Sequence, residues 1–255
     1  MRCFKLFTLL FFIATLAGAQ TIVPLNTGYN QAAFAPYPAV TSTTSTTQDL
    51  YWLNIATYPP TAPPVGPSFV ISPSGGWTAA YAGTNWISAR NSSASASGVT
   101  TSVRGYTIFR ECFCLMQNYN SAQLSFTAKA DDLIQVWVNS ITNVALAPVF
   151  GNFNGTGIAS LPSQPGWFHA GTNCVYALVE DIGGSNGFDL VGTVQANGLA
   201  PLPATGATPP VFFPCDCNPS TPNVTPEDDA MVADLLKIAE EHRAGELVRS
   251  RPTSH

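Results

Sequence analysis

The sequence predicts an all-β fold, a sandwich or barrel of short strands, followed by a Pro-rich linker and one C-terminal helix. Three observations predict it. Short runs rich in Val, Ile, Phe, Tyr, Trp and Thr recur between clusters of Gly, Pro, Asn and Ser, which is the pattern of strands separated by turns. Helical periodicity is absent before residue 225. After residue 200, prolines become frequent and a helical pattern follows them.

The first 19 residues have the layout of a secretory signal peptide. Arg2 and Lys5 precede an apolar run from Leu6 to Leu16, and three small residues end the segment at Ala19. The run is short for a membrane span, so cleavage after Ala19 is favoured over an uncleaved anchor. Later segments show no long apolar run, and no membrane span is expected. We therefore expect a protein that is secreted or displayed on the extracellular surface.

Residues 20–200, the predicted β-sandwich domain, carry few charges: four basic side chains against seven acidic ones. Such a surface has no basic stripe to neutralise phosphates, so nucleic acid is not an expected partner. Three Asn-x-Ser/Thr sequons would accept glycans in an exported chain and make it a glycoprotein. They begin at Asn91, Asn154 and Asn223.

Alternation along the predicted strands assigns their two faces. In residues 122–130, Leu124, Phe126 and Ala128 share one side, and Lys129 lies on the other. In residues 133–139, Trp137 faces away from the apolar side of its strand. The apolar sides together predict a sandwich interior. The seven predicted strands span residues 49–57, 68–72, 105–115, 122–130, 133–139, 173–181 and 187–196.

Removal of Cys3 with the signal peptide leaves five cysteines. Disulfides are favoured over zinc, because an exported chain meets an oxidising compartment and neither Cys-x-Cys pair has the usual ligand spacing. A bridge from Cys112 or Cys114 to Cys174 is preferred, since all three lie on predicted strands. An odd number leaves at least one cysteine free or paired between chains. The five are Cys112, Cys114, Cys174, Cys215 and Cys217.

The C-terminal part divides into a linker, a helix and a tail. Residues 201–224 are Pro-rich and predict an extended linker. Residues 225–248 predict an amphipathic helix, in which Pro226 suits the first position and Met231, Leu235 and Ile238 recur at helical spacing. A helix of this size is marginal alone in water, so we expect docking on its own domain or self-association. Residues 249–255 are expected to form a disordered tail.

Several segments together resemble secreted galactose-binding-like jelly-roll domains, a family of exported bacterial type. They are "LNTGYN" (25–30), "DLYW", "NWIS", "GYTIFRECFCL", "LSFTAKADDLIQVWVNS" and "HAGTNCVYALVEDIGGSNGFDLVGT", and the resemblance extends to residue 199. It implies a two-sheet jelly-roll sandwich that binds glycans or other surface ligands through loops at one rim. Some members hold a structural calcium. In this sequence Ser140 replaces the usual Gly after Asn139, and the helix differs from the family's transmembrane sorting tail.

Four tryptophans are candidates for stacking against a sugar. Three lie near turn-forming residues, and the fourth faces away from the apolar side of its strand. The alternative for each is a buried anchor, because large aromatic side chains are usually well buried. An exposed concave patch shared by several of them would favour sugar binding. The four are Trp77, Trp86, Trp137 and Trp167.

Acidic residues offer two further candidates. Asp131 and Asp132 fall between two predicted strands, where turn formation is favoured over a ligand or calcium role. Adjacent acids in an extended chain point to opposite faces, which suits a glycosidase acid pair poorly. Glu180, Asp181 and Asp189 flank a Gly-rich loop and are candidate ligands of a structural calcium, the one cofactor considered. Solvated loop acids are the alternative.

These observations predict an exported, non-catalytic binding module for carbohydrate or another surface ligand. The alternative is a structural surface or assembly protein that self-associates through the sandwich and the C-terminal helix. An enzyme is not expected, since His169 is the only histidine in residues 20–200. A triad assembled around it from distant positions has little support in the sequence.

Overall fold

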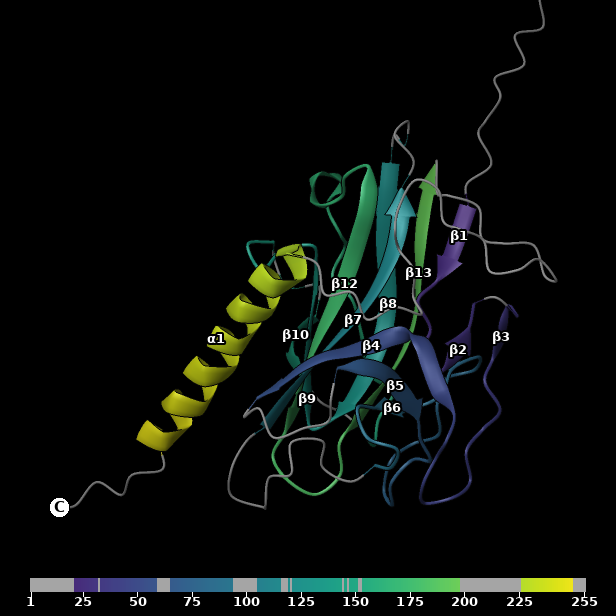
Figure 1. Cartoon of the computed structure of the whole chain (residues 1–255), viewed down its shortest axis with the longest axis vertical. Coiled ribbons are helices and arrows are strands. Elements are labelled where there is room, and N and C mark those ends of the chain that lie inside the picture. Colours follow the sequence, from purple (N-terminus) through teal and green to yellow (C-terminus); the bar gives the residue numbers. More distant parts are fainter. Residues whose placement is uncertain are drawn as a thin grey trace, which may run out of the picture.

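The structure is a computed structural model, and it describes residues 21–31, 33–58, 65–93, 105–115, 119, 121–143, 145, 147–150, 153–197 and 226–249 (Figure 1). The predicted signal peptide, the predicted linker with Cys215, Cys217 and Asn223, and residues 250–255 lie outside these ranges. Arg249, predicted in the tail, is the last residue of the helix.

Antiparallel strands form the body of the protein. Five of them are 11 residues long: β4 (Gln48–Tyr58), β7 (Gly105–Leu115), β8 (Ser121–Asp131), β12 (Gly171–Asp181) and β13 (Gly187–Asn197). The others are β1 (Thr21–Pro24), β2 (Tyr29–Asn30), β3 (Ala35–Pro36), β5 (Gly66–Val70), β6 (Ile87–Ser88), β9 (Leu133–Val138), β10 (Ala147–Phe150) and β11 (Ile158–Ala159). One short 3-10 helix, η1 (Pro165–Trp167), and one α-helix, α1 (Pro226–Arg249), complete the described elements.

The strands pair in the order β10-β9-β12-β7-β4-β5-β6-β13-β8-β11, with β1 added to β13 and a separate β2–β3 pair. The sheet curls, so that β9, β12 and β7 face β13 and β8 across a shared interior (Figure 1). The all-β prediction is therefore confirmed, and the body is sandwich-like. The six short strands that the sequence did not predict have two to four residues each, too few to show an alternating pattern.

The predicted faces are confirmed. Leu124, Phe126 and Ala128 lie in the interior, as do the apolar sides of β9 and β12. The interior also contains an aromatic group in which Phe188 contacts Trp52 and Phe109, at ring centroid distances of 5.3 and 4.9 Å. Full burial of an apolar side chain stabilises the fold by about 1.5–3 kcal/mol, so this interior is the main source of stability.

A disulfide joins Cys112 on β7 to Cys174 on β12, residues that are direct partners in the strand register. The bond confirms one of the two predicted bridges to Cys174. Cys114 is also disulfide-bonded, so each of the three cysteines within the described ranges takes part in a disulfide.

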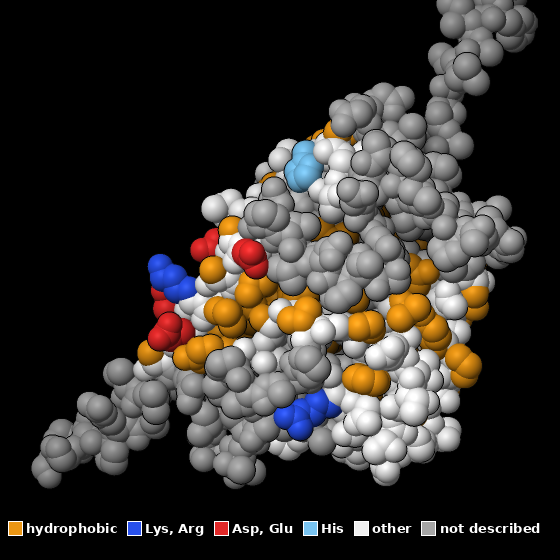
Figure 2. Space-filling view, viewed as in Figure 1, with side chains coloured by type: hydrophobic (Ala, Val, Ile, Leu, Met, Phe, Trp, Pro, Cys, Tyr) orange, Lys and Arg blue, Asp and Glu red, His pale blue; other side chains and the backbone are white. Residues whose placement is uncertain are grey.

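Helix α1 docks on the outer face of the sheet formed by β4, β7, β12 and β9 (Figure 1). Met231, Leu235 and Ala239 are buried there against an aromatic and aliphatic surface. The helix therefore uses its apolar side on its own domain, one of the two predicted outcomes. Charged side chains lie along its solvent side, whereas apolar side chains continue over the neighbouring sheet (Figure 2). The part of the chain that the structure describes holds no helix with the length and apolar character of a membrane span.

Candidate functional site

Three segments meet at one end of the body, which we call the rim: the loop of residues 71–86, the turn between β8 and β9, and residues 182–186 between β12 and β13. Two side-chain hydrogen bonds join them. The hydroxyl oxygens of Ser74 and Ser185 lie 2.7 Å apart, and the indole N–H of Trp77 donates to Asp131 Oδ2 at 2.7 Å. The rim is thus held together by polar contacts between segments far apart in the sequence.

Trp77 is the half-buried tryptophan of the rim. Its ring stacks on Trp86, with centroids 4.2 Å apart and planes 33° apart. Gly75 and Gly76 precede it, both exposed, and a Cβ atom at either position would meet no atom within 4 Å. The stack and the hydrogen bond fix the indole, and the two glycines before it are open to solvent.

The other three candidate tryptophans do not join Trp77 in an exposed patch. Trp86 is 1 % exposed, and Trp137 is 4 % exposed beneath α1. Trp167 is half-buried against the interior, and its carbonyl oxygen accepts a hydrogen bond from Asn139, which follows β9. The rim lies at the start of β9, so Trp167 is at the opposite end of that strand.

Asp131 and Asp132 form the turn between β8 and β9, as predicted, and the peptide bond between them is cis. Burial raises the pKa of Asp131 to about 7; the hydrogen bond to Asp132 and the charges of Asp132 and Asp181 also raise it, and the Trp77 N–H lowers it. Asp132 is half-buried and accepts the N–H of Ile182.

The structure does not bring the three predicted calcium ligands together. Asp181 accepts the N–H of Gly183 at 2.8 Å, at the interior side of its strand. Glu180, one residue earlier, is on the opposite side of the same strand. Asp189 lies on β13, where it binds side chains from other segments. Within the described ranges, no group of three or more His, Cys, Asp and Glu residues is placed to hold a metal ion.

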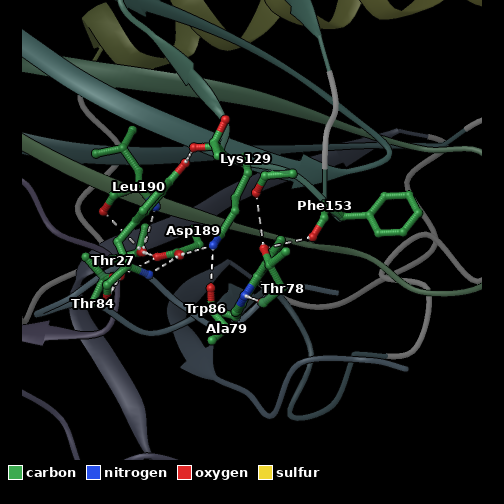
Figure 3. Close-up of polar contacts among 12 residues, drawn as sticks. Thr27, Thr78, Ala79, Thr84, Trp86, Lys129, Phe153, Asp189 and Leu190 are labelled. Carbon is green, nitrogen blue, oxygen red and sulfur yellow. Dashed lines mark hydrogen bonds and ion pairs between the residues drawn. The ribbon is translucent and has the colours of Figure 1, made fainter. Parts of the chain in front are cut away.

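A buried ion pair fastens the loop 71–86 to the body (Figure 3). Lys129 and Asp189 are register partners on β8 and β13, their side chains are 3 % and 0 % exposed, and Nζ lies 3.4 Å from Oδ2. The loop contributes the carbonyl oxygen of Ala79, which accepts from Lys129, and the N–H of Tyr81, which donates to Asp189 at 2.8 Å. The loop is therefore held against the outer face of β8 and β13.

Further contacts satisfy both charges of this pair. The hydroxyl groups of Thr27 and Thr84 donate to Asp189 Oδ1 (Figure 3). The Lys129 ammonium lies 4.2 Å from the ring centroid of Tyr81 and 5.5 Å from that of Trp86, within the range of a cation–π interaction. Burial raises the pKa of Asp189, although Thr84, Tyr81 and Lys129 all oppose the shift. The sequence analysis did not identify this ion pair. The feature of the sequence that could have indicated it is Lys129, the single Lys of residues 20–200.

Two carboxyl groups in the interior were also missed. Asp49 is fully buried and accepts three main-chain N–H groups, from Gly28 at 2.7 Å, Tyr51 at 3.0 Å and Trp52 at 3.2 Å. Glu111 is 1 % exposed; Oε1 accepts the amide N–H of Gln31, and Oε2 has no hydrogen-bond partner.

Burial of these two carboxyl groups favours their neutral, protonated forms. Burial raises the pKa of Asp49 to about 7. Burial raises the pKa of Glu111 well above its usual range, and the negative charge of Asp49 adds to the shift. Alternation in β7 places Glu111 on the same side as the core residues Phe109 and Phe113, so a signal was present in the sequence.

Residues 183–187 have the spacing Gly-x-Ser-x-Gly, which the sequence analysis also missed. In α/β-hydrolases this pattern sits on a strand-to-helix turn. Here it joins two strands, β12 and β13, and the Ser185 hydroxyl is hydrogen-bonded to Ser74. His169 precedes β12, at the other end of that strand. The context of Ser185 is therefore not that of a nucleophile elbow.

Two of the predicted glycosylation sites fall on described residues. Asn91 and Asn154 are both exposed, so their side-chain amides are accessible to a glycosyltransferase.

Comparisons of the chain with protein-family models, with curated proteins and with solved structures found no match. By its fold, the chain is an antiparallel, sandwich-like β-domain with a docked C-terminal helix. At its rim a half-buried tryptophan, Trp77, lies beside acidic side chains.

Proposed function

We propose that this protein is a secreted, non-catalytic binding module that recognises carbohydrate at the rim, and that its body is a two-sheet jelly roll. The observation that carries the proposal is Trp77. The residue is half-buried and its ring is fixed by Trp86 and Asp131, so little freedom is lost when a ligand stacks on it. Aromatic rings held rigidly beside hydrogen-bonding groups suit sugars, which have an apolar face and polar edges.

The polar groups beside Trp77 suit the hydroxyl groups of a sugar. Asp132 is half-buried at the same turn as the Trp77 partner Asp131. The Gly-rich loop of residues 182–186 contributes exposed main chain at Gly184, where a Cβ atom would meet nothing within 4 Å. Carboxylate oxygens accept hydrogen bonds from hydroxyl groups, while open main chain permits a close approach.

A glycan array probed with the full-length protein tests the proposal, followed by calorimetry with each glycan that binds. Trp77→Ala is expected to weaken binding at least tenfold, about 1.4 kcal/mol. Trp167→Ala is the matched control, because it removes a half-buried tryptophan at the opposite end of β9 and should leave the affinity unchanged. Silence across the array, or equal losses in both variants, would count against the rim as a carbohydrate site.

Self-association through α1 is less well supported than ligand binding. The apolar side of α1, which a second copy would need, is occupied by contacts with Tyr106, Ile108 and Trp137 of its own sheet. An assembly built on the helix would first have to break these contacts.

A further inference from the structure

The Lys129–Asp189 pair is an amine and a carboxyl group held together in a site closed to solvent. The two residues are opposite each other on β8 and β13, and their side chains are 3 % and 0 % exposed. Nζ lies 3.4 Å from Oδ2, and the Ala79 carbonyl oxygen accepts a hydrogen bond from the same Nζ (Figure 3). Groups held in fixed contact react as parts of one molecule, so a bond between them does not need a collision.

The two carboxyl oxygens of Asp189 have different partners. Oδ1 accepts the hydroxyl groups of Thr84 at 2.5 Å and Thr27 at 3.2 Å. Oδ2 lies beside the Lys129 ammonium and accepts the N–H of Tyr81 at 2.8 Å. Two donors on one oxygen stabilise the negative charge that develops there when a nucleophile attacks the carboxyl carbon. The other oxygen lies where it can take protons from the ammonium group and leave as water.

Burial of the pair favours loss of its charges. The rings of Tyr81 and Trp86 lie over Nζ, and the loop 71–86 covers both side chains. Burial raises the pKa of Asp189, which favours the neutral carboxyl group that an amine attacks. Amide formation removes both charges and releases water, so it removes the free-energy cost of keeping two ions in the interior.

We propose that Lys129 and Asp189 condense into an isopeptide bond, a covalent amide link between β8 and β13. This modification goes beyond the proposed binding function and does not depend on it. The buried ion pair of the folded chain is its starting state. Because β8 and β13 carry the contacts that hold the loop 71–86, the link would fix the strands on which that loop rests.

The reaction needs no co-reactant. The Lys129 ammonium gives one proton to Asp189 Oδ2, which leaves a neutral amine beside a neutral carboxyl group. The Nζ lone pair then forms a bond to Cγ, and the electron pair of the C=O bond moves onto Oδ1, where the two threonine hydroxyls stabilise it. A second proton passes from Nζ to Oδ2, the Cγ–Oδ2 bond breaks, and one water molecule leaves. The product is a neutral amide.

The intact mass of the secreted protein, reduced and enzymatically deglycosylated, tests the proposal. We expect the unmodified chain to be lighter than its sequence by one water molecule. Lys129→Arg keeps the positive charge but removes the amine, so it should have the full mass of its sequence. Lys237→Arg makes the same change at an exposed position of α1, and this matched control should keep the mass deficit.

Amine labelling of the denatured and reduced chain gives an independent measurement. Beyond the predicted signal peptide, Lys129 and Lys237 are the only lysines of the sequence. We expect Lys237 to be labelled completely and Lys129 to resist labelling. Proteolytic fragments should include one branched peptide that joins the β8 and β13 sequences.

The opposite results are equally clear. A full mass in the unmodified protein, with Lys129 labelled as completely as Lys237, overturns the inference, and the pair is then an ion pair only. This result leaves the carbohydrate function standing, since the glycan array tests that function separately. A mass deficit that persists in Lys129→Arg also overturns the inference, because the water would have been lost at another site. If Lys129→Arg fails to fold, the mass and labelling of the unmodified protein decide.

Discussion

At the scale of single residues, the Lys129–Asp189 pair is the contact that holds the loop 71–86 in place. Both side chains are buried, and each has partners besides the other. A buried pair of this kind need not add net stability over an apolar substitute, but removal of one partner leaves an uncompensated charge. We therefore expect that removal of one charge destabilises the fold much more than removal of both charges.

Lys129→Met should destabilise the protein by about 3–5 kcal/mol, because Asp189 would remain buried without its cation. The double variant Lys129→Met with Asp189→Leu should recover part of that loss, since no charge would be left unpaired. Chemical denaturation of the two variants measures the difference. A single variant as stable as the unmodified protein would show that the pair does not hold the loop.

The sequence reveals these residues only in part. Alternation places Lys129 on the side of β8 opposite the core, which is correct, but alternation alone suggests solvent there. The loop 71–86 that covers Lys129 has no periodicity from which its position could be inferred. Trp137 is a second example. Alternation correctly places it on the side of β9 opposite the core, but it is buried there by the helix of residues 226–249. The alternation within one strand cannot predict that a segment distant in the sequence will cover one of its faces.

At the scale of elements, α1 depends on a few buried side chains for its position. Leu235 is fully buried in the contact, whereas Ala233 on the same turn is exposed. Its start at Pro226 and its apolar spacing are local features and could be predicted from the sequence. Its docking surface could not, because that surface combines residues from β4, β7, β9 and β12.

Leu235→Asp should undock α1, since it places a charge in an apolar contact and removes a buried leucine, at a cost of about 2–5 kcal/mol. Ala233→Asp introduces the same charge on the exposed side and serves as the matched control. Limited proteolysis of the helix and the emission of Trp137 report the change. Equal protease resistance in the two variants would mean that the helix does not depend on this contact.

The Cys112–Cys174 bond links two neighbouring strands, β7 and β12, across 62 residues of chain. Replacement of both cysteines by serine should lower the stability by about 2–5 kcal/mol, chiefly because the unfolded chain gains freedom. Thermal unfolding of this variant under non-reducing conditions measures the loss. Single replacements are less informative, since they leave a free thiol that can exchange with the disulfide at Cys114.

At the scale of the whole molecule, the interior acids Asp49 and Glu111 link stability to pH. In the unfolded chain they ionise near pH 4. In the folded protein Asp49 holds its proton to about pH 7, and burial raises the pKa of Glu111 well above its usual range. Above about pH 4 the folded state therefore binds more protons than the unfolded state, so stability falls as pH rises. The contribution of Asp49 is fully present below about pH 4 and is lost as pH rises through about 7.

The melting temperature should therefore decrease between about pH 5 and pH 8. Glu111→Gln should flatten the curve, because glutamine stays neutral and also removes a charge next to Asp49. Glu240→Gln changes an exposed residue of α1 and should leave the slope unchanged. A melting temperature that rises with pH over this range would contradict the protonation of the two acids.

The pairing of β1 with β13 determines where the described body begins relative to the rim. Thr21 lies opposite Ala196, next to the last residue of β13, while the rim lies at the first residue, Gly187. Eleven extended residues, about 35 Å, separate these ends. The N-terminal end of the described body is therefore remote from Trp77. A carrier fused before Thr21 would leave the rim unobstructed.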